Sequence, residues 1–157
     1  SINTDIPRVH NWLERFSQSR KVSLSTEQLQ AVETAAYSKI MIITGGPGVG
    51  KTFCTRTIVS LWKAMGKSIA LAAPTGRAAQ RLGEMTGLEA KTIHRLLEFD
   101  PKTRKFKSDR TNPLPQKAII VDEASMLDLF LAYSLFEAVA PATQILHVGD
   151  IMRFTVC

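Results

Sequence analysis

The chain has 157 residues, of which 45% are hydrophobic, and its 20 basic and 14 acidic residues give a formal charge of +6. This composition predicts one globular domain of ordinary size, and the positive charge favours an anionic partner, either nucleotide or nucleic acid. Two cysteines are too few for a disulfide framework or a cysteine metal site, and no apolar run is long enough to span a bilayer.

No signal-peptide pattern precedes the first predicted helix, so we expect a cytoplasmic protein without a membrane partner. The sequence opens on Ser1 rather than Met, which suggests a piece of a longer protein. Residues 1–23 are predicted to form an N-terminal helix and a linker. Apolar side chains recur at helical spacing over residues 6–16 with Pro7 in the first turn, and residues 17–21 are a polar linker.

The next segment, residues 24–32, carries a helix-start signature. Ser25 followed by Gln28 matches a capping box, in which each side chain bonds the backbone N–H of the other residue. The segment also resembles the adenine-reading glutamine segment of superfamily-one helicases, and a primary amide can pair with both N6 and N7 of adenine. Gln28 is therefore a candidate for a helix cap and for an adenine contact.

Residues 45–52 read GGPGVGKT, which fits the phosphate-binding pattern G-x-x-x-x-G-K-[ST] without substitution. An apolar run at residues 40–44 predicts a buried parallel strand before it, and residues 53–65 predict a helix after it. The glycines let successive backbone N–H groups face one oxyanion, and the helix N-terminus adds its positive dipole end. Lys51 would reach the outer phosphates, and the Thr52 hydroxyl would bind a magnesium ion. The candidate nucleotide-binding residues of this loop are Gly46, Pro47, Gly48, Val49, Gly50, Lys51, Thr52 and Phe53.

A second apolar strand is predicted at residues 68–73, where it ends at Pro74, and a helix follows over residues 75–87. Parallel sheets bind ligands at the carboxyl ends of their strands, so Thr75 and Arg77 are candidates for binding phosphate there. The spacing equally fits an exposed first helical turn with an ordinary arginine.

Residues 92–97 predict a short helix with its apolar side chains facing inward. His94 has no cysteine or second histidine at ligand spacing, which argues against a metal site and leaves hydrogen bonding or nucleic-acid contact. Residues 99–116 are a basic segment bounded by prolines, which predicts a loop or a small excursion. A solvated face explains its charges, and contact with a DNA backbone is the alternative.

Residues 118–123 read AIIVDE, a predicted buried strand that ends in two carboxylates at the same sheet edge as the phosphate loop. In a phosphate-loop enzyme the first carboxylate, Asp122, holds magnesium through water, and Glu123 orients and deprotonates the attacking water. A nucleotide kinase does not need the second carboxylate, so the pair favours hydrolysis. The predicted catalytic residues are Lys51, Asp122 and Glu123, and the predicted metal ligands are Thr52 and Asp122.

Residues 134–139 are predicted to complete a helix after the carboxylate strand, and residues 144–148 to form a further strand. Because strands alternate with helices, we expect an α/β fold in which a mostly parallel sheet carries helices on both faces.

Four segments in this order, residues 45–52, 73–79, 92–97 and 121–127, resemble the RecD family of superfamily-one DNA helicases, the exodeoxyribonuclease V alpha subunit and its stand-alone relatives. The resemblance covers residues 24–150 and implies a RecA-like P-loop NTPase domain, the first of two motor domains, with ATP and Mg²⁺ as cofactors. It implies 5′–3′ movement along single-stranded DNA in repair or recombination, with other helicase–nuclease subunits as candidate partners. The implied DNA-binding residues are Pro74, Thr75, Gly76, Arg77 and His94.

The C-terminal residues depart from this family. In relatives Gly149 and Asp150 are followed, two residues on, by Gln-Leu-Pro, and that glutamine couples the outer phosphate to DNA. Arg153 stands at the glutamine position here, so we treat residues 151–157 as an atypical tail.

The sequence also stops before the second motor domain and its arginine finger, so we expect this chain to bind ATP and hydrolyse it slowly. Two other functions remain open. One is a P-loop ATPase that remodels protein or acts as a switch without DNA, and the other is a module that keeps the fold for subunit contact.

Overall fold

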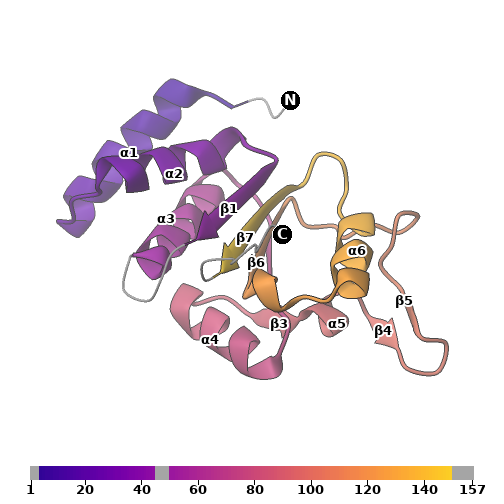
Figure 1. Ribbon diagram of the computed structural model, residues 1–157. Coiled ribbons are helices and arrows are strands. Elements are labelled where there is room, and N and C mark those ends of the chain that lie inside the picture. Colours follow the sequence, from indigo (N-terminus) through magenta and orange to yellow (C-terminus); the bar gives the residue numbers. More distant parts are fainter. Residues whose placement is uncertain (1–3, 45–49, 150–157) are drawn as a thin grey trace, which may run out of the picture.

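A five-stranded parallel sheet forms the centre of the molecule in the computed structural model, which describes residues 4–44 and 50–149 (Figure 1). The strands are β1 (Ile40–Thr44), β2 (Ile69–Ala73), β3 (Ala90–Thr92), β6 (Ala118–Asp122) and β7 (Gln144–Gly149). They lie in the order β1-β7-β6-β2-β3, and every neighbouring pair is parallel. All five strands therefore end at one edge of the sheet, and the predicted α/β fold class is confirmed.

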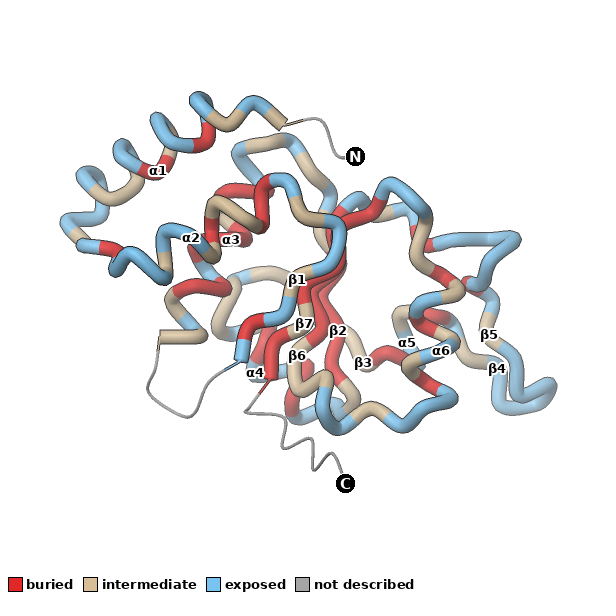
Figure 2. Tube along the Cα trace, turned by 45° about the horizontal axis from the view of Figure 1, so that its top comes forward, coloured by how far each residue is buried: buried red, intermediate tan, exposed pale blue. Residues whose placement is uncertain are grey.

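Helices cover both faces of the sheet. Successive residues of a strand point to opposite sides, so an apolar strand needs packing partners on each face. One face packs against α2 (Thr26–Tyr37), α3 (Lys51–Ala64) and α4 (Gly76–Thr86), and the other packs against α5 (Ile93–Leu96) and α6 (Leu129–Glu137). Within β6, Ile120 joins the first core with Trp62 of α3, whereas Ile119 joins the second core with Leu135 of α6. Figure 2 shows the buried strands β2, β6 and β7 as a layer between these helices.

The edge strand β1 is less buried than its apolar sequence predicts. Met41 and Ile43 face the α2–α3 core, so Ile40 and Ile42 face the opposite side, where they are 56% and 58% exposed. The buried residues that the central sheet contributes to the core on that side come from β2, β6 and β7. The prediction of a fully buried strand is therefore wrong, because the helices on that side do not extend over β1.

The N-terminal helix α1 (Ile6–Arg20) is longer than predicted, because it continues through residues expected to form a linker. It ends where Lys21 adopts a φ of 52°. Trp12 stacks on Phe16 with 5.0 Å between ring centroids, and the Arg20 guanidinium lies 5.4 Å from the Phe16 centroid. These contacts along one helix face favour a helical conformation for the polar last turn.

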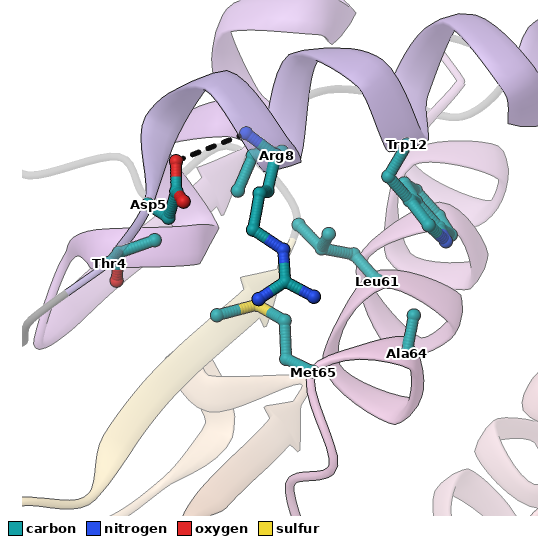
Figure 3. A pocket seen from close by; sticks show the side chains of 8 residues that line it. Thr4, Asp5, Arg8, Trp12, Leu61, Ala64 and Met65 are labelled. Carbon is teal, nitrogen blue, oxygen red and sulfur yellow. Dashed lines mark hydrogen bonds between the residues drawn. The ribbon is translucent and has the colours of Figure 1, made fainter.

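Near its start, α1 borders a cavity of about 300 Å³ beside α3 (Figure 3). Arg8 and Trp12 extend from α1 toward Leu61 of α3 and Met65, the residue that follows α3. The Asp5 side chain caps α1 by accepting a hydrogen bond from the Arg8 backbone N–H at 3.3 Å. The N-terminal helix is held mainly by α2, with hydrogen bonds from Thr4 to the Ala36 carbonyl oxygen and between His10 and Glu33.

The basic segment forms the predicted excursion, a short antiparallel hairpin of β4 (Phe99–Asp100) and β5 (Lys105–Phe106). Helix α6 ends at Glu137, within the residues predicted to complete a helix, and the Asp128 side chain caps its start by accepting from the Leu131 N–H at 2.7 Å. Across residues 4–44 and 50–149, the structure holds no helix that combines the length and the hydropathy needed to cross a membrane.

Candidate nucleotide site and DNA-contact turn

The start of α3 and the carboxyl ends of β6 and β7 border a cavity of about 230 Å³. The predicted catalytic and metal-binding side chains come from two distant segments of the sequence, and all of them line this one cavity. Its lining residues are Lys51, Thr52, Thr55, Arg81, Met85, Asp122, Glu123, Val148 and Gly149. We call it the nucleotide cavity.

The phosphate-loop side of the nucleotide cavity begins at Gly50, which caps α3 with a φ of 76°, a conformation that glycine adopts without strain. Lys51 is the first residue of α3, and its Nζ donates a hydrogen bond to the Gly149 carbonyl oxygen at 3.1 Å. Thr52 is exposed at the same helix N-terminus, whereas the Phe53 side chain is half-buried and packs against the core. The other predicted loop contacts, Gly46, Pro47, Gly48 and Val49, lie outside the described residues.

The opposite side of the cavity is formed by the two carboxylates at the end of β6. Asp122 is the last residue of the strand, and its Oδ1 accepts a hydrogen bond from the Glu123 N–H at 2.8 Å. Glu123 adopts a left-handed conformation with a φ of 54°, which costs a residue other than glycine about 1–2 kcal/mol. This turn redirects the Glu123 side chain relative to the strand.

Arg81 is a cavity residue that the sequence analysis missed. Its Nη2 lies 3.2 Å from the Glu123 Oε1, and the two side chains are 63% and 29% exposed respectively. Arg81 belongs to α4, one helical turn beyond Arg77, so the two cations share a face of that helix. The i, i+4 spacing of these arginines was the available signal, but nothing in the sequence connects Arg81 with β6.

Gln28 forms the predicted capping box and also lies beside the phosphate loop. Its Oε1 accepts from the Ser25 N–H at 3.0 Å, and the Ser25 Oγ accepts from the Gln28 N–H at 3.2 Å. A Cβ added at Gly50 would lie 2.7 Å from the Gln28 Nε2. The cap therefore holds the amide next to Gly50, and a carbonyl oxygen has a second lone pair for a further donor.

The candidate DNA-contact turn, residues 74–77, lies between β2 and α4 at the same sheet edge as the nucleotide cavity. Pro74 is half-buried, and Thr75, Gly76 and Arg77 are exposed. The Thr75 Oγ1 accepts a hydrogen bond from the Ala78 N–H at 3.2 Å and so caps α4. None of the four residues lines the nucleotide cavity, but α4 connects the turn directly with Arg81.

His94 lies on α5, two residues beyond Thr92, which pairs with Ala73 at the strand end that leads into this turn. It is exposed, and its ring meets Phe99 edge-on with 5.4 Å between centroids and lies 6.0 Å from Phe106. The basic side chains of the hairpin are exposed. His94 therefore makes aromatic contacts on the segment that neighbours the DNA-contact turn, and its contact with DNA stays a prediction.

Two further titratable side chains near the site have structural surroundings. Cys54 on α3 is buried, and burial raises the pKa of its thiol, which keeps it protonated at neutral pH. His147 on β7 is half-buried beside Phe136, and burial lowers its pKa, which favours the neutral ring. Both environments fit packing roles.

The chain is similar to several characterised proteins. The family model described as an AAA domain matches residues 28–155. The ATP-dependent RecD2 DNA helicase of Deinococcus radiodurans is 42% identical over 127 residues, which are 81% of this chain and 18% of that protein. The RecBCD enzyme subunit RecD of Mycolicibacterium smegmatis is 40% identical over 148 residues, covering 79% of this chain and 27% of that protein.

A solved structure shares the fold. The Pif1 helicase from Candida albicans superposes with a TM-score of 0.58 and 26% identity over 82% of this chain and 33% of that chain. The chain thus spans 18% and 27% of the lengths of the two curated relatives, so the comparison concerns one part of each of them.

Proposed function

Because this chain belongs to the AAA domain family and to its RecD-like helicase members, we propose that it is the ATP-binding first motor domain of a superfamily-one DNA helicase. The complete protein would couple ATP hydrolysis to 5′–3′ movement along single-stranded DNA in repair or recombination. The observation that carries this proposal is the convergence of Lys51, Thr52, Asp122 and Glu123 on one cavity at the carboxyl edge of a parallel sheet.

In this proposal the nucleotide phosphates occupy the cavity between the start of α3 and the end of β6. The N-terminus of α3 favours an anion through its N–H groups and its dipole. The Lys51 ammonium lies inside the cavity and would exchange its contact with the Gly149 carbonyl oxygen for an outer phosphate. Gln28, held beside Gly50, would contact the adenine at the other end of the nucleotide.

The cavity also fits a magnesium ion. Thr52 supplies a hydroxyl and Asp122 a carboxylate to the same cavity, and Mg²⁺ takes such hard oxygen ligands together with phosphates and waters. When bound, the ion would supply positive charge to the phosphates during transfer. Thr52 and Asp122 would hold it, while the neighbouring Glu123 N–H fixes the orientation of the Asp122 carboxylate.

Glu123 would orient the attacking water and accept its proton. Its left-handed backbone places the carboxylate at the cavity rather than along the axis of β6. A positioned general base of this kind contributes about 10² to 10⁴ in rate. Because this role activates a water molecule, it favours hydrolysis over phosphate transfer to a second substrate.

Single-stranded DNA would lie over residues 74–77 and near His94, with the exposed Arg77 contacting a phosphate. The first turn of α4 offers backbone N–H groups beside this arginine, which suits a phosphate oxygen. Relatives named as RecBCD subunits make other helicase–nuclease subunits candidate partners of the complete protein. Residues 24–150 would form the first of two motor domains, preceded by residues 1–23 and followed by the tail at residues 151–157.

Calorimetric titration of magnesium and a slowly hydrolysed ATP analogue into the chain tests this function. We expect binding that Lys51→Ala weakens by at least about tenfold, because charge-assisted hydrogen bonds to phosphate are lost. Lys63→Ala is the matched control, since it removes the same charge from the exposed far end of α3. Equal binding by both variants would refute the nucleotide site.

The same titration is then repeated with a single-stranded oligonucleotide present. We expect the oligonucleotide to change the nucleotide affinity, because coupling between two ligands must be reciprocal. Nucleotide binding that depends on Lys51 but ignores the oligonucleotide would instead favour a P-loop ATPase that remodels protein.

A further inference from the structure

Helix α4 carries two arginines that face different parts of the site. Arg77 is exposed in the first turn, within the candidate DNA-contact turn, and Arg81 follows one helical turn later on the same face. The Arg81 guanidinium reaches Glu123, the carboxylate proposed to orient the attacking water. One helix face therefore connects the DNA-contact turn with a catalytic group.

The Arg81–Glu123 pair can open at little cost. The Arg81 side chain is 63% exposed and that of Glu123 29% exposed, so solvent screens their attraction. Arg81 also has donors beyond the one that meets the Glu123 Oε1, because a guanidinium carries five N–H groups. A phosphate approaching the Arg77 face would thus compete with the carboxylate for the same cation.

We propose that Arg81 is a positioning residue that pairs with Glu123 in the absence of DNA and with a DNA phosphate when a single strand lies over the DNA-contact turn. In the first state the guanidinium holds the Glu123 carboxylate, which then does not orient the attacking water. In the second state a DNA phosphate binds the guanidinium, and the Glu123 carboxylate can orient the attacking water in the nucleotide cavity that it lines. The inference rests on the proposed function, because it requires single-stranded DNA at residues 74–77.

A double-mutant cycle of single-stranded DNA affinity tests the exchange. Glu123→Ala is expected to tighten binding up to about fivefold when Arg81 is present, because the guanidinium no longer has to leave a carboxylate. Arg81→Ala is expected to weaken binding and to lower the log–log salt slope by about 0.7, one phosphate contact to a single strand. In the Arg81→Ala background, Glu123→Ala is expected to give no more than the small gain that loss of any one negative charge gives.

Glu84→Ala provides the matched control for removing a negative charge. Glu84 is exposed on the same helix and pairs with Gln80, so its removal leaves the Arg81–Glu123 pair in place. We expect it to give the same small gain in affinity with and without Arg81. An equal gain from Glu123→Ala in both backgrounds would mean that bulk charge alone acts, which would overturn the exchange.

Hydrolysis under single-turnover conditions supplies a second readout. Arg81→Ala is expected to raise the rate without DNA and to remove the stimulation by DNA, while Arg81→Lys restores part of both. A lower rate without DNA would show that Arg81 assists the reaction directly, and the exchange would be wrong. If the wild-type chain binds no single-stranded DNA, the proposed function fails as well. Measurable DNA binding with an additive cycle contradicts the Arg81 inference alone.

Discussion

The nucleotide cavity and the DNA-contact turn lie at the same edge of one sheet, but their side chains are held in different ways. In the cavity, contacts join segments far apart in the sequence, such as Lys51 with the Gly149 carbonyl oxygen and Arg81 with Glu123. In the turn, Thr75 caps its own helix and Arg77 is exposed. The cavity therefore depends on the whole fold, whereas the turn depends on one strand end and one helix start.

This difference indicates how each region would respond to substitution. Each cavity side chain is assigned a different role. A substitution there should therefore affect either hydrolysis or nucleotide binding strongly, depending on the residue. A change in the turn acts on a local cap or on one surface charge, and the expected effects are smaller.

Glu123→Gln should give the largest effect. We expect single-turnover hydrolysis to fall about 10² to 10⁴-fold, because the amide cannot accept the proton of the attacking water. Nucleotide affinity should stay within about twofold, since Glu123 is not assigned to the phosphates. Rapid-quench measurement of product and calorimetric titration check the two parts, and an equal loss of binding would contradict the assigned role.

Asp122→Asn should weaken magnesium-dependent nucleotide binding by about 10- to 100-fold, the loss expected for a charge-assisted contact of about 1.5–3 kcal/mol. Binding measured in the presence of a chelator should be unchanged, because no metal is then held. Asp128→Asn is the control, since Asn can still cap α6. A loss that is the same with and without magnesium would place Asp122 outside the metal site.

Thr75→Ala should lower the free energy of unfolding by about 1 kcal/mol, because it removes the cap of α4. Thr75→Ser keeps the hydroxyl and should restore the stability. Denaturant melts followed by circular dichroism measure both variants. Nucleotide affinity should be unaffected, and a change there comparable with that of a cavity variant would break the distinction between the two regions.

Arg77→Ala should give the smallest effect. We expect weaker single-stranded DNA binding with a log–log salt slope lower by about 0.7, because one phosphate contact is lost. Fluorescence titration at several salt concentrations measures the slope. Arg56→Ala is the control, since Arg56 is exposed on α3 away from the turn. An unchanged slope would mean that Arg77 makes no phosphate contact.

Much of the fold was predictable, and the errors have physical causes. The strands at β1, β6 and β7 were placed correctly from apolar runs, and the capping box at Ser25 was found from its spacing. The burial of β1 was misjudged, because an apolar run does not say whether a helix covers each face of the strand. The last turn of α1 was missed because stacking among Trp12, Phe16 and Arg20 outweighs its polar composition.

The sequence by itself determined the order of elements and the residue types offered at each strand end: a lysine and threonine after one strand, two carboxylates after another. Those features depend on local spacing and on hydrophobic period, which act over a few residues. Only the tertiary structure decided that β7 lies between β1 and β6, which brings the Gly149 carbonyl oxygen to Lys51, and that α4 brings Arg81 to Glu123. Strand order and helix docking follow from the burial of the whole core, so no local pattern encodes them.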